Sequence, residues 1–294
     1  MLNVLSTTNL EKSYKGKLAL KNCTIDIPAG AVVALVGPNG AGKTTLLDII
    51  SGLLHPSHGE VRLFEKIEPG SPEALERIGF VAQNSPLNKN MKVITAVRIT
   101  ELLNITFDRE YAFDRLDRLQ ISLKRRIGQL SGGQKSQVAL TLALAGHPNL
   151  LLLDEPLSDL DPLAREQFLK DLMTNVAASD TSIIFSSHTI SELEKVCDYL
   201  ILIVRGEVKL CDSMERIIET HKMIACAPGE LEHREDIEII ERKLDSRFAT
   251  HLVRFNNPLS PTYLEAQPSR LEDIVLAYLR RDQEIGALNN SVNL

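Results

Sequence analysis

Cysteine is scarce in this sequence, and apolar stretches long enough to cross a bilayer are missing. The four cysteines are far apart and form no C-x-x-C pair; they are Cys23, Cys197, Cys211 and Cys226. This spacing argues against a disulfide framework or a zinc site and predicts reduced thiols in the cytosol. The longest apolar runs, such as Tyr199 to Val204, have the length of strands and fall well short of about 20 residues. The N-terminal segment has no apolar core of a signal peptide, so we expect a protein that does not itself cross a membrane.

A surplus of basic residues is also missing. Lysine and arginine together number 33, against 39 aspartates and glutamates, which gives a net charge of −6. Nucleic-acid-binding proteins normally present a basic face, so this balance predicts that nucleic acid is not a partner. The 294 residues suit one large domain with an appendage or two modest domains, and an apolar content of 44% is ordinary for a soluble protein with a sizeable core.

Continuous apolar runs separated by helical patterns dominate residues 1–218. The run from Ala31 to Gly37 has the pattern of a strand buried on both faces, and a glycine loop and a helix from Thr44 to Ile50 follow it directly. Similar runs come later, at residues 78–83, 149–156, 181–188 and 199–204. Strands that alternate with helices predict an α/β fold around a largely parallel sheet.

Two regions depart from this alternation. Between about residues 84 and 146 the sequence is amphipathic and charged, which predicts an inserted helical subdomain. Residues 219–294 predict a small α+β appendage, with strands at Lys222–Ala227 and Thr250–Phe255 and a disordered tail after Gln283. Two helices are expected there, one with an apolar face of Ile237, Ile240 and Leu244 and one with a face of Leu271, Ile274, Val275, Tyr278 and Leu279.

The glycine loop fits the pattern G-x-x-x-x-G-K-[ST] from Gly37 to Thr44, between a predicted strand and a predicted helix. We expect its three glycines to let backbone N–H groups turn inward around a phosphate chain, because glycine has no Cβ. The helix that follows directs its positive end at the same anions. Lys43 can reach the β and γ phosphates, and the Thr44 hydroxyl can hold Mg²⁺. The alternative is a glycine turn with a chance lysine; the strand–loop–helix context favours nucleotide binding.

Two adjacent carboxylates follow the apolar run Leu150–Leu153. Asp154 and Glu155 are expected at the carboxyl end of that strand, the edge of a parallel sheet where the glycine loop also lies. There Asp154 can face Mg²⁺, and Glu155 can polarise a water beside the γ phosphate. Acids that merely cap a strand at its solvent edge are the alternative interpretation.

A Ser-Gly-Gly sequence opens the predicted helix within Leu130–Leu144. Its N-terminus and backbone N–H groups can form a second anion cradle. Ser131 as an ordinary N-cap would explain the serine but not the two glycines that follow it. Because one monomer with a single nucleotide motif does not need two phosphate sites, we expect this segment to close over the nucleotide held by a second copy or a homologue.

The motifs and their order resemble those of the ATP-binding-cassette (ABC) ATPases over roughly residues 1–215. The glycine loop, Gln83, the signature segment "LSGGQ" (Leu130–Gln134), "LLLLDE", "SDLD" (Ser158–Asp161) and His188 follow one another in the family's order. The resemblance implies a P-loop NTPase (RecA-like) core, an N-terminal antiparallel β subdomain and an inserted helical subdomain. It also implies ATP hydrolysis with Mg²⁺ in a head-to-tail dimer.

The resemblance assigns a role to each motif residue. It implies that Tyr14 stacks on adenine, although Tyr14 packed beside a turn and His188 as a surface histidine are the alternatives. The implied catalytic residues are Glu155 (general base), His188, Gln83 and Lys43, and the implied Mg²⁺ ligands are Thr44, Gln83 and Asp154. The implied nucleotide-binding residues are Tyr14, Gly37, Pro38, Asn39, Gly40, Ala41, Gly42, Lys43, Thr44, Thr45, Ser131, Gly133, Gln134 and Asp161.

Two positions depart from the family pattern. Gln137 stands where the family often has arginine, so a nearby ion pair is expected to be absent. Asp159 stands where a small residue is common, and it places extra charge at the expected dimer contact. Neither change removes a chemical group, so an active ATPase is still expected.

Three classes of cassette compete: a transporter subunit, a DNA-repair or chromosome ATPase, and a soluble cassette of translation or iron–sulfur assembly. Only 88 positions separate Lys43 from Ser131, too few for the long coiled coil of chromosome ATPases, and the acidic charge disfavours DNA. Translation cassettes carry two copies, and iron–sulfur cassettes leave the residues after about 220 unexplained. The transporter subunit is the preferred interpretation.

The C-terminal tail indicates the branch of transporter. Its sequence "SRLEDIVLAYLRR" resembles the tails of bacterial drug, antibiotic and lantibiotic exporters, with an importer ATPase as the alternative. The implied partners are a separate transmembrane permease and, in a homodimer or heterodimer, another ABC ATPase subunit. The expected location is cytoplasmic, peripheral on the inner face of the cell membrane through the permease.

Overall fold

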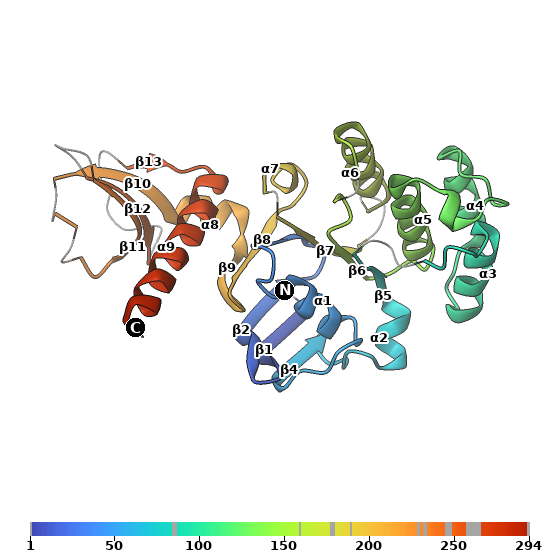
Figure 1. Cartoon of the computed structure of the whole chain (residues 1–294), viewed down its shortest axis with the longest axis horizontal. Coiled ribbons are helices and arrows are strands. Elements are labelled where there is room, and N and C mark those ends of the chain that lie inside the picture. Colours follow the sequence, from blue (N-terminus) through green and yellow to red (C-terminus); the bar gives the residue numbers. More distant parts are fainter. Residues whose placement is uncertain are drawn as a thin grey trace.

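The computed structural model describes residues 2–83, 87–158, 160–176, 180–188, 190–227, 230–231, 234–244, 249–256 and 266–292. Within these residues the strands form three sheets with helices packed around them (Figure 1). The C-terminal sheet and the helical insertion lie at opposite ends of the molecule, with the central sheet between them (Figure 1). None of the described helices combines the length and the apolar character that a membrane span requires.

The central sheet explains the continuous apolar runs of the sequence. Its order is β5 (Ile78–Val81), β6 (Leu150–Asp154), β7 (Ser182–Ser187), β3 (Val32–Val36), β8 (Tyr199–Val204) and β9 (Glu207–Ser213). Neighbouring strands are parallel except β8 and β9. Leu151 and Leu153 of β6 enter one hydrophobic core, and Leu150 and Leu152 enter another, so this strand is buried on both faces. The predicted α/β fold around a largely parallel sheet is confirmed.

The N-terminal antiparallel sheet packs against the helix that follows the glycine loop. Its order is β2 (Lys17–Pro28), β1 (Asn3–Tyr14) and β4 (His58–Leu63). Leu5 and Ile25 from this sheet share a core with Leu46 and Ile50 of α1 (Lys43–Ile50). Because residues of the central sheet belong to the same core, α1 is held between the two sheets.

The insertion is helical, as predicted, and has its own core. After α2 (Pro72–Arg77) and β5 it contains α3 (Val93–Leu103), α4 (Arg109–Arg118), the 3₁₀ turn η1 (Ile127–Gln129) and α5 (Gly132–Leu144). Val97, Leu116 and Val138 from the three α-helices pack together. Two further helices, α6 (Pro162–Val176) and α7 (Ile190–Leu193), follow β6 and β7.

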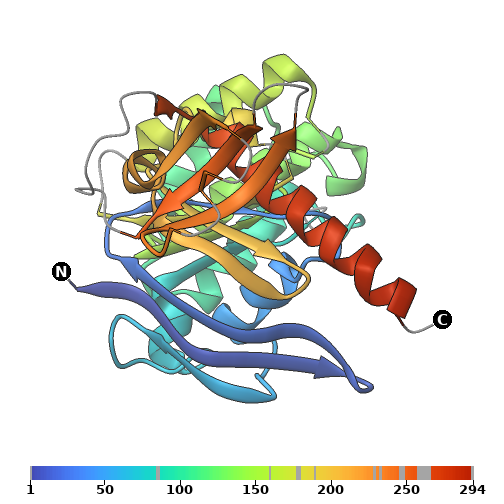
Figure 2. The ribbon, with the colours of Figure 1, turned by 90° about the vertical axis from the view of Figure 1, so that its left-hand side faces the viewer.

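Beyond β9 the chain builds a small α+β module. After α8 (Met214–Thr220), its strands pair in the order β11 (Ile237–Leu244), β12 (Ala249–Phe255), β10 (His221–Cys226) and β13 (Gln267–Pro268). The helix α9 (Leu271–Val292) lies across this sheet, in front of the central sheet in Figure 2. Ile274 and Val275 of α9 share a core with Ile240 and Leu252. The predicted strands at β10 and β12 and the apolar face of α9 are confirmed.

Two expectations for this module differ from the structure. Residues 237–244 form strand β11 and not a helix. Their spacing imitates a helix because the strand has a register shift between Ile239 and Glu241 and is covered on both faces, with Ile237 in one core and Ile240 in the other. The backbone after Gln283, expected to be disordered, continues as helix to Val292. Adding residues to the existing helix α9 requires no new nucleation.

Candidate active site

The glycine loop connects the buried end of β3 to the first turn of α1. Gly40 and Gly42 have φ angles of 78° and 111°, which residues with a Cβ rarely adopt. Gly37 serves differently, since a Cβ there would lie 2.2 Å from the carbonyl oxygen of Ile203 on β8. The expected reason for glycine therefore holds for two positions, and the third is a close packing contact with β8.

The loop borders a cavity of about 310 Å³. The structure brings the loop together with Gln83 and Glu155, which are distant in sequence. The complete lining is Ala19, Asn39, Gly40, Ala41, Gly42, Lys43, Thr44, Thr45, Gln83 and Glu155. Because α1 begins at Lys43 within this lining, the unpaired N–H groups of its first turn open at the cavity. The cavity therefore suits an anionic phosphate chain.

Lys43 lines the cavity and is 6% exposed. Its ammonium donates to the carbonyl oxygen of Gly37 at 2.8 Å and to that of Pro38 at 3.4 Å. The same nitrogen lies 3.3 Å from Oε1 of Glu155. A buried, charge-paired ammonium beside the start of a helix is well placed to bind phosphate oxygens.

Glu155 follows β6 with a φ of 47°, in the left-handed region that few non-glycine residues occupy. Its backbone N–H donates to the hydroxyl of Ser186 on β7 at 2.8 Å. Its side chain is 10% exposed, and Oε2 lies 2.9 Å from Nδ1 of His188. Lys43 and His188 thus hold the carboxylate at the edge of the cavity, and Ser186 holds the backbone of the same residue. Strained backbone of this kind gathers at functional sites.

Asp154 is 1% exposed, and both of its carboxylate oxygens are hydrogen-bonded. Oδ2 accepts from the Thr44 hydroxyl at 2.8 Å, and Oδ1 accepts from the Ser186 hydroxyl at 2.6 Å. Burial, together with the nearby charge of Asp154, raises the pKa of Asp48 on α1. Asp154 therefore ties the start of α1 to the ends of β6 and β7 and places negative charge beside the glycine loop.

Ser186 is a site residue that sequence reasoning missed. Its buried hydroxyl donates to Asp154 and accepts from the backbone of Glu155, so it orients the Asp154 carboxylate and fixes the backbone from which the Glu155 side chain extends. The signal was present in the run "IIFSSH", because a serine on a strand buried on both faces needs a hydrogen-bond partner.

The side chains of Thr44 and Asp154 fit a magnesium ion. Hydroxyl, carboxylate and amide oxygens are the hard ligands that Mg²⁺ prefers, and Gln83 brings an amide to the same cavity. Among the described residues, no group of three or more His, Cys, Asp or Glu side chains is arranged to hold a metal ion. A small protein ligand set completed by substrate phosphates and water is the usual way to bind Mg²⁺.

The signature segment lies apart from this cavity. Ser131 is the N-cap of α5: its hydroxyl accepts from the N–H of Gln134 at 3.1 Å, and the Gln134 side chain accepts from the N–H of Ser131 at 3.2 Å. A Cβ at Gly133 would lie 3.0 Å from Cδ2 of Leu160. The alternative interpretation of Ser131 as an N-cap is therefore correct within a single chain, and close packing accounts for one of the two glycines.

Asp161 and Tyr14 also lie outside the cavity lining. Asp161 accepts from the N–H of Ala164 at 2.9 Å at the start of α6. Tyr14, the last residue of β1, is 47% exposed, and the ammonium of Lys12 lies 5.4 Å from the centre of its ring. The structure therefore presents both residues at the surface, and their predicted contacts with nucleotide lie beyond the phosphate cavity.

Gln137 takes part in a buried polar cluster. Its side-chain oxygen accepts from Nη2 of Arg115 at 3.0 Å. Nε of Arg115 donates to Thr141 at 3.2 Å, and its guanidinium lies 4.0 Å from Asp171 on α6. Gln137 thus makes a hydrogen bond where an arginine could have made an ion pair, and the ion pair of this cluster joins Arg115 to Asp171 on another helix. Asp159, the second departure from the family pattern, lies outside the described residues.

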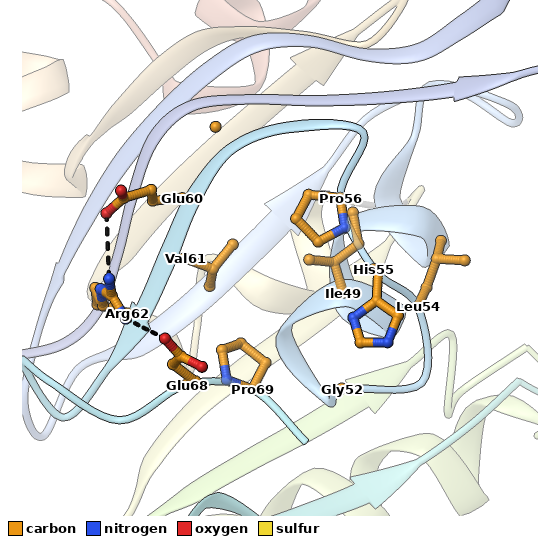
Figure 3. Close-up of a pocket in the computed structure, with 11 residues that line it drawn as sticks. Ile49, Gly52, Leu54, His55, Pro56, Glu60, Val61, Arg62, Glu68 and Pro69 are labelled. Atoms are coloured by element: carbon orange, nitrogen blue, oxygen red, sulfur yellow. Dashed lines mark hydrogen bonds and ion pairs between the residues drawn. The ribbon is translucent and has the colours of Figure 1, made fainter. Parts of the chain in front are cut away.

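A second hollow of about 340 Å³ lies between the end of α1 and β4, with a lining separate from that of the phosphate cavity (Figure 3). His55, Pro56 and Pro69 border it. Arg62 pairs there with Glu60 at 3.4 Å and with Glu68 at 2.9 Å. Because these charges compensate one another, the hollow has a different character from the cavity at the glycine loop.

Known proteins are similar to this chain in sequence and in fold. A family model described as ABC transporter matches residues 20–158. The lantibiotic transport ATP-binding protein SrtF of Streptococcus pyogenes is 34% identical over 214 residues, covering 70% of this chain and 90% of that protein. The sulfate/thiosulfate import ATP-binding protein CysA of Escherichia coli (strain K12) is 33% identical over 223 residues, covering 72% of this chain and 61% of that protein.

Solved structures agree with these matches. The dimeric structure of MJ0796, a bacterial ABC transporter cassette, is 28% identical with a TM-score of 0.64, covering 71% of this chain and 98% of that chain. The structure of cbiO1 from Clostridium perfringens, part of the cbiONQ complex, is 28% identical with a TM-score of 0.64, covering 74% and 91%. The similar proteins share an ATP-binding cassette and differ in what they transport.

Proposed function

Because this chain belongs to the ABC family of transporter ATPases, we propose that it powers export of a drug, antibiotic or peptide through a separate transmembrane permease. Hydrolysis of ATP is the activity of this family, and the direction of transport is the proposal. It rests on coverage, since the match spans 90% of the lantibiotic transport protein but 61% of the sulfate/thiosulfate importer. We place the chain in the cytoplasm, held at the inner face of the cell membrane by its permease. An importer ATPase is the alternative.

The glycine loop supports binding of the ATP phosphates in this proposal. Backbone N–H groups at the start of α1 and the ammonium of Lys43 surround the cavity from the loop side. Thr44, Asp154 and Gln83 would hold Mg²⁺, which supplies neutralising charge to the phosphates when it is bound. Lys43 would orient the β and γ phosphates, while its contact with Gly37 fixes the position of its ammonium.

Glu155 is proposed as the general base. Its side chain is nearly buried; Lys43 and His188 contact the carboxylate, and Ser186 accepts a hydrogen bond from the backbone N–H. A carboxylate fixed in this way can accept the proton of a water that attacks the γ phosphate. His188 contacts Glu155 through Nδ1 and can direct its other ring nitrogen towards the γ phosphate.

A second cassette is proposed to complete the site. The cavity has its lining on the glycine-loop side, whereas the signature segment and Asp161 lie outside it. In a head-to-tail dimer, Ser131, Gly133 and Gln134 would face the partner's loop, and Tyr14 would stack on adenine. Two observations support such a contact face: MJ0796 is described as dimeric, and Leu163, two residues after Asp161, is 77% exposed. The partner is a second copy or another ABC ATPase.

A groove of about 450 Å³ is the proposed site of contact with the permease. Phe80, Ala82 and Leu87 line it together with residues of α3 and α5. Exposed apolar residues that a partner can cover lie at the end of α3 and just after it. They are Leu102, Leu103 and Ile105, which are 85%, 82% and 89% exposed. Ala82 lines this groove and the adjacent Gln83 lines the phosphate cavity, so movement at one can reach the other.

We propose that the permease contacts this groove together with the segment Asn84–Val97, of which residues 84–86 lie outside the described residues. Cross-linking from single introduced cysteines in the full chain, coexpressed with its permease, tests the proposal. Leu103→Cys should cross-link to the permease, whereas Leu276→Cys on α9 is the matched control and should not. Cross-links confined to residues 220–294 would show that the coupling surface lies elsewhere.

Transport into liposomes tests the direction. With the complex reconstituted and ATP supplied outside, those complexes whose cassettes face outward should move substrate into the lumen if the protein is an exporter. Movement of substrate out of preloaded liposomes under the same conditions would support the importer alternative and contradict the export proposal.

A further inference from the structure

The C-terminal module is connected to the glycine loop through one turn, which joins β8 to β9. Only Arg205 and Gly206 join β8 to β9, since the flanking residues pair with each other. The N–H of Gly206 donates to the carbonyl oxygen of Ala41 in the glycine loop at 2.9 Å. Nε of Arg205 lies 2.7 Å from Oδ2 of Asp282 on α9, which passes beside this hairpin in Figure 2. Two adjacent residues thus connect the helix of the module to the loop that would bind phosphates.

The contacts between this turn and the loop are made by backbone. A Cβ at Gly206 would lie 2.6 Å from the carbonyl oxygen of Ala19, and one at Gly42 would lie 2.7 Å from the same oxygen. Ala19 itself lines the phosphate cavity. Because these segments are in direct backbone contact, a change of rotamer cannot absorb a displacement of the turn. A shift of Gly206 would therefore reach the loop.

The conformation of Arg205 indicates that its side chain has a use. Its φ is 49° and that of Gly206 is 81°, so both central residues of this hairpin turn are left-handed. Asparagine, aspartate and glycine are the residues that adopt this conformation at low cost, and arginine is not among them. The ion pair with Asp282 gives the arginine a role that compensates for the strained backbone.

We propose that Arg205 and Asp282 are positioning residues for ATP binding. Through this pair, α9 holds the β8–β9 turn, and the turn holds Ala41 and the glycine loop in the shape that binds phosphates. The path ends at the phosphate-binding loop, so the C-terminal module sets the affinity for ATP more than the rate of hydrolysis. The inference rests on ATP binding at the glycine loop and is independent of the direction of transport and of the partner cassette.

Titration of the full chain with ATP tests the pair. Asp282→Asn and Arg205→Asn each remove one charge, and asparagine tolerates the left-handed backbone at position 205. Each variant should raise the Kd and KM for ATP about two- to fivefold while kcat stays within about a factor of two, because a partly exposed ion pair is disrupted. The exchanged pair, Arg205→Asp with Asp282→Arg, should return the Kd to the wild-type value.

A second ion pair on the same helix provides the matched control. Arg280 lies 2.8 Å from Glu241 on β11, so Arg280→Gln loosens the module without touching the β8–β9 turn. Its Kd for ATP should equal that of the wild type. A wild-type Kd in Asp282→Asn, or an equal rise in Arg280→Gln, would overturn the inference while leaving the proposed function intact. Failure of the wild-type chain to bind ATP would instead overturn the proposed function.

Discussion

The glycine-loop side of the site and the signature segment are built in opposite ways. On the glycine-loop side, the hydrogen bond from Thr44 to Asp154 joins residues 110 positions apart, and the buried Lys43 reaches Glu155. In the signature segment, Ser131 and Gln134 bond to each other across three positions at the exposed start of a helix. The geometry of the glycine-loop side thus depends on contacts between distant segments, whereas the hydrogen bonds of the signature segment are local.

This difference separates two kinds of dependence. Groups held by long-range contacts keep their geometry in a single folded chain, so that side of the site should bind nucleotide without a partner. A locally capped helix start exposes its hydroxyl and N–H groups, and a second chain can contact them without disturbing the fold. We therefore expect substitutions on the glycine-loop side to alter binding or chemistry, and substitutions in the signature segment to alter assembly.

The largest effect is expected for Glu155→Gln. This change keeps the shape of the side chain but removes the base, so the rate of hydrolysis should fall about 10²- to 10⁴-fold while ATP still binds. Phosphate release and nucleotide titration measure the two quantities separately. Glu166→Gln, at an exposed position of α6, is the matched control and should hydrolyse ATP at the wild-type rate. Near-normal turnover in Glu155→Gln would contradict the proposed base.

A smaller effect, a loss of affinity for ATP, is expected for Lys43→Ala. Without the ammonium, the phosphates lose a charge-assisted contact, and the Kd for ATP should rise about ten- to a hundredfold. Fluorescence titration with a labelled nucleotide gives this value. Lys66→Ala, at an exposed position before α2, should keep the wild-type Kd. If both variants bind equally well, Lys43 is not a phosphate ligand.

The Ser131→Arg change tests the signature segment. Added to Glu155→Gln, it should block the ATP-dependent dimer through its bulk at the interface, while the Kd of the single chain stays within about a factor of two because Ser131 lies outside the cavity. Light scattering with and without ATP measures the mass. Ser122→Arg, at an exposed loop position, should still dimerise. A monomer mass for the Glu155→Gln chain in ATP would refute a homodimer and leave a different cassette as the partner to be tested.

Mixing two inactive variants sharpens the comparison further. Chains with Ser131→Arg and chains with Lys43→Ala can form a mixed dimer, because only one of its two sites then carries the added bulk; that site carries both changes, and the other is intact. If the two sites act independently, the mixture should recover part of the ATPase rate that each variant lacks alone. Rates equal to the average of the separate variants would contradict a shared site.

The smallest effect is expected for Gly133→Ala. The new Cβ would lie 3.0 Å from the flexible end of Leu160, and this crowding opposes the gain of about 1 kcal/mol in helix propensity. The free energy of unfolding of the monomer should therefore change by less than about 1 kcal/mol, as measured by urea denaturation. ATP-dependent dimerisation should weaken, because the change also adds bulk at the proposed contact. A destabilised monomer would indicate that Gly133 is required for packing within the chain.

The same division explains which features the sequence could predict. Strands such as Leu150–Asp154 and the start of α1 follow from local apolar patterns and from the glycine loop, and the structure confirms them. Strand β11 could not be identified locally, because its register shift and two covered faces depend on α9 and on the neighbouring strands. Cores formed between distant segments leave no periodic signal along the chain.

The site shows the same limit. The pattern around Lys43 predicts phosphate binding, since loop and helix are adjacent in sequence, and the structure brings Gln83 and Glu155 into the same cavity. Ser186 and the pair of Arg205 with Asp282 could not be assigned roles from spacing, because their partners come from other strands and from the C-terminal helix. The role of a side chain that orients others through tertiary contacts can be assigned only from the folded structure.

The contact between Lys43 and Glu155 should respond to the nucleotide that is bound. The Lys43 ammonium lies 3.3 Å from Oε1 of Glu155, so a γ phosphate bound by the same ammonium would bring a second anion close to that carboxylate and repel it. We expect the arrival of ATP to weaken the contact between Lys43 and Glu155, while His188 and the backbone bond to Ser186 still hold the glutamate in place. ADP lacks the γ phosphate but keeps the β phosphate, so it would compete less strongly for the ammonium. The contact would then make the action of Glu155 as a base depend on the nucleotide that is bound, because the γ phosphate to be removed is also the group that loosens the contact.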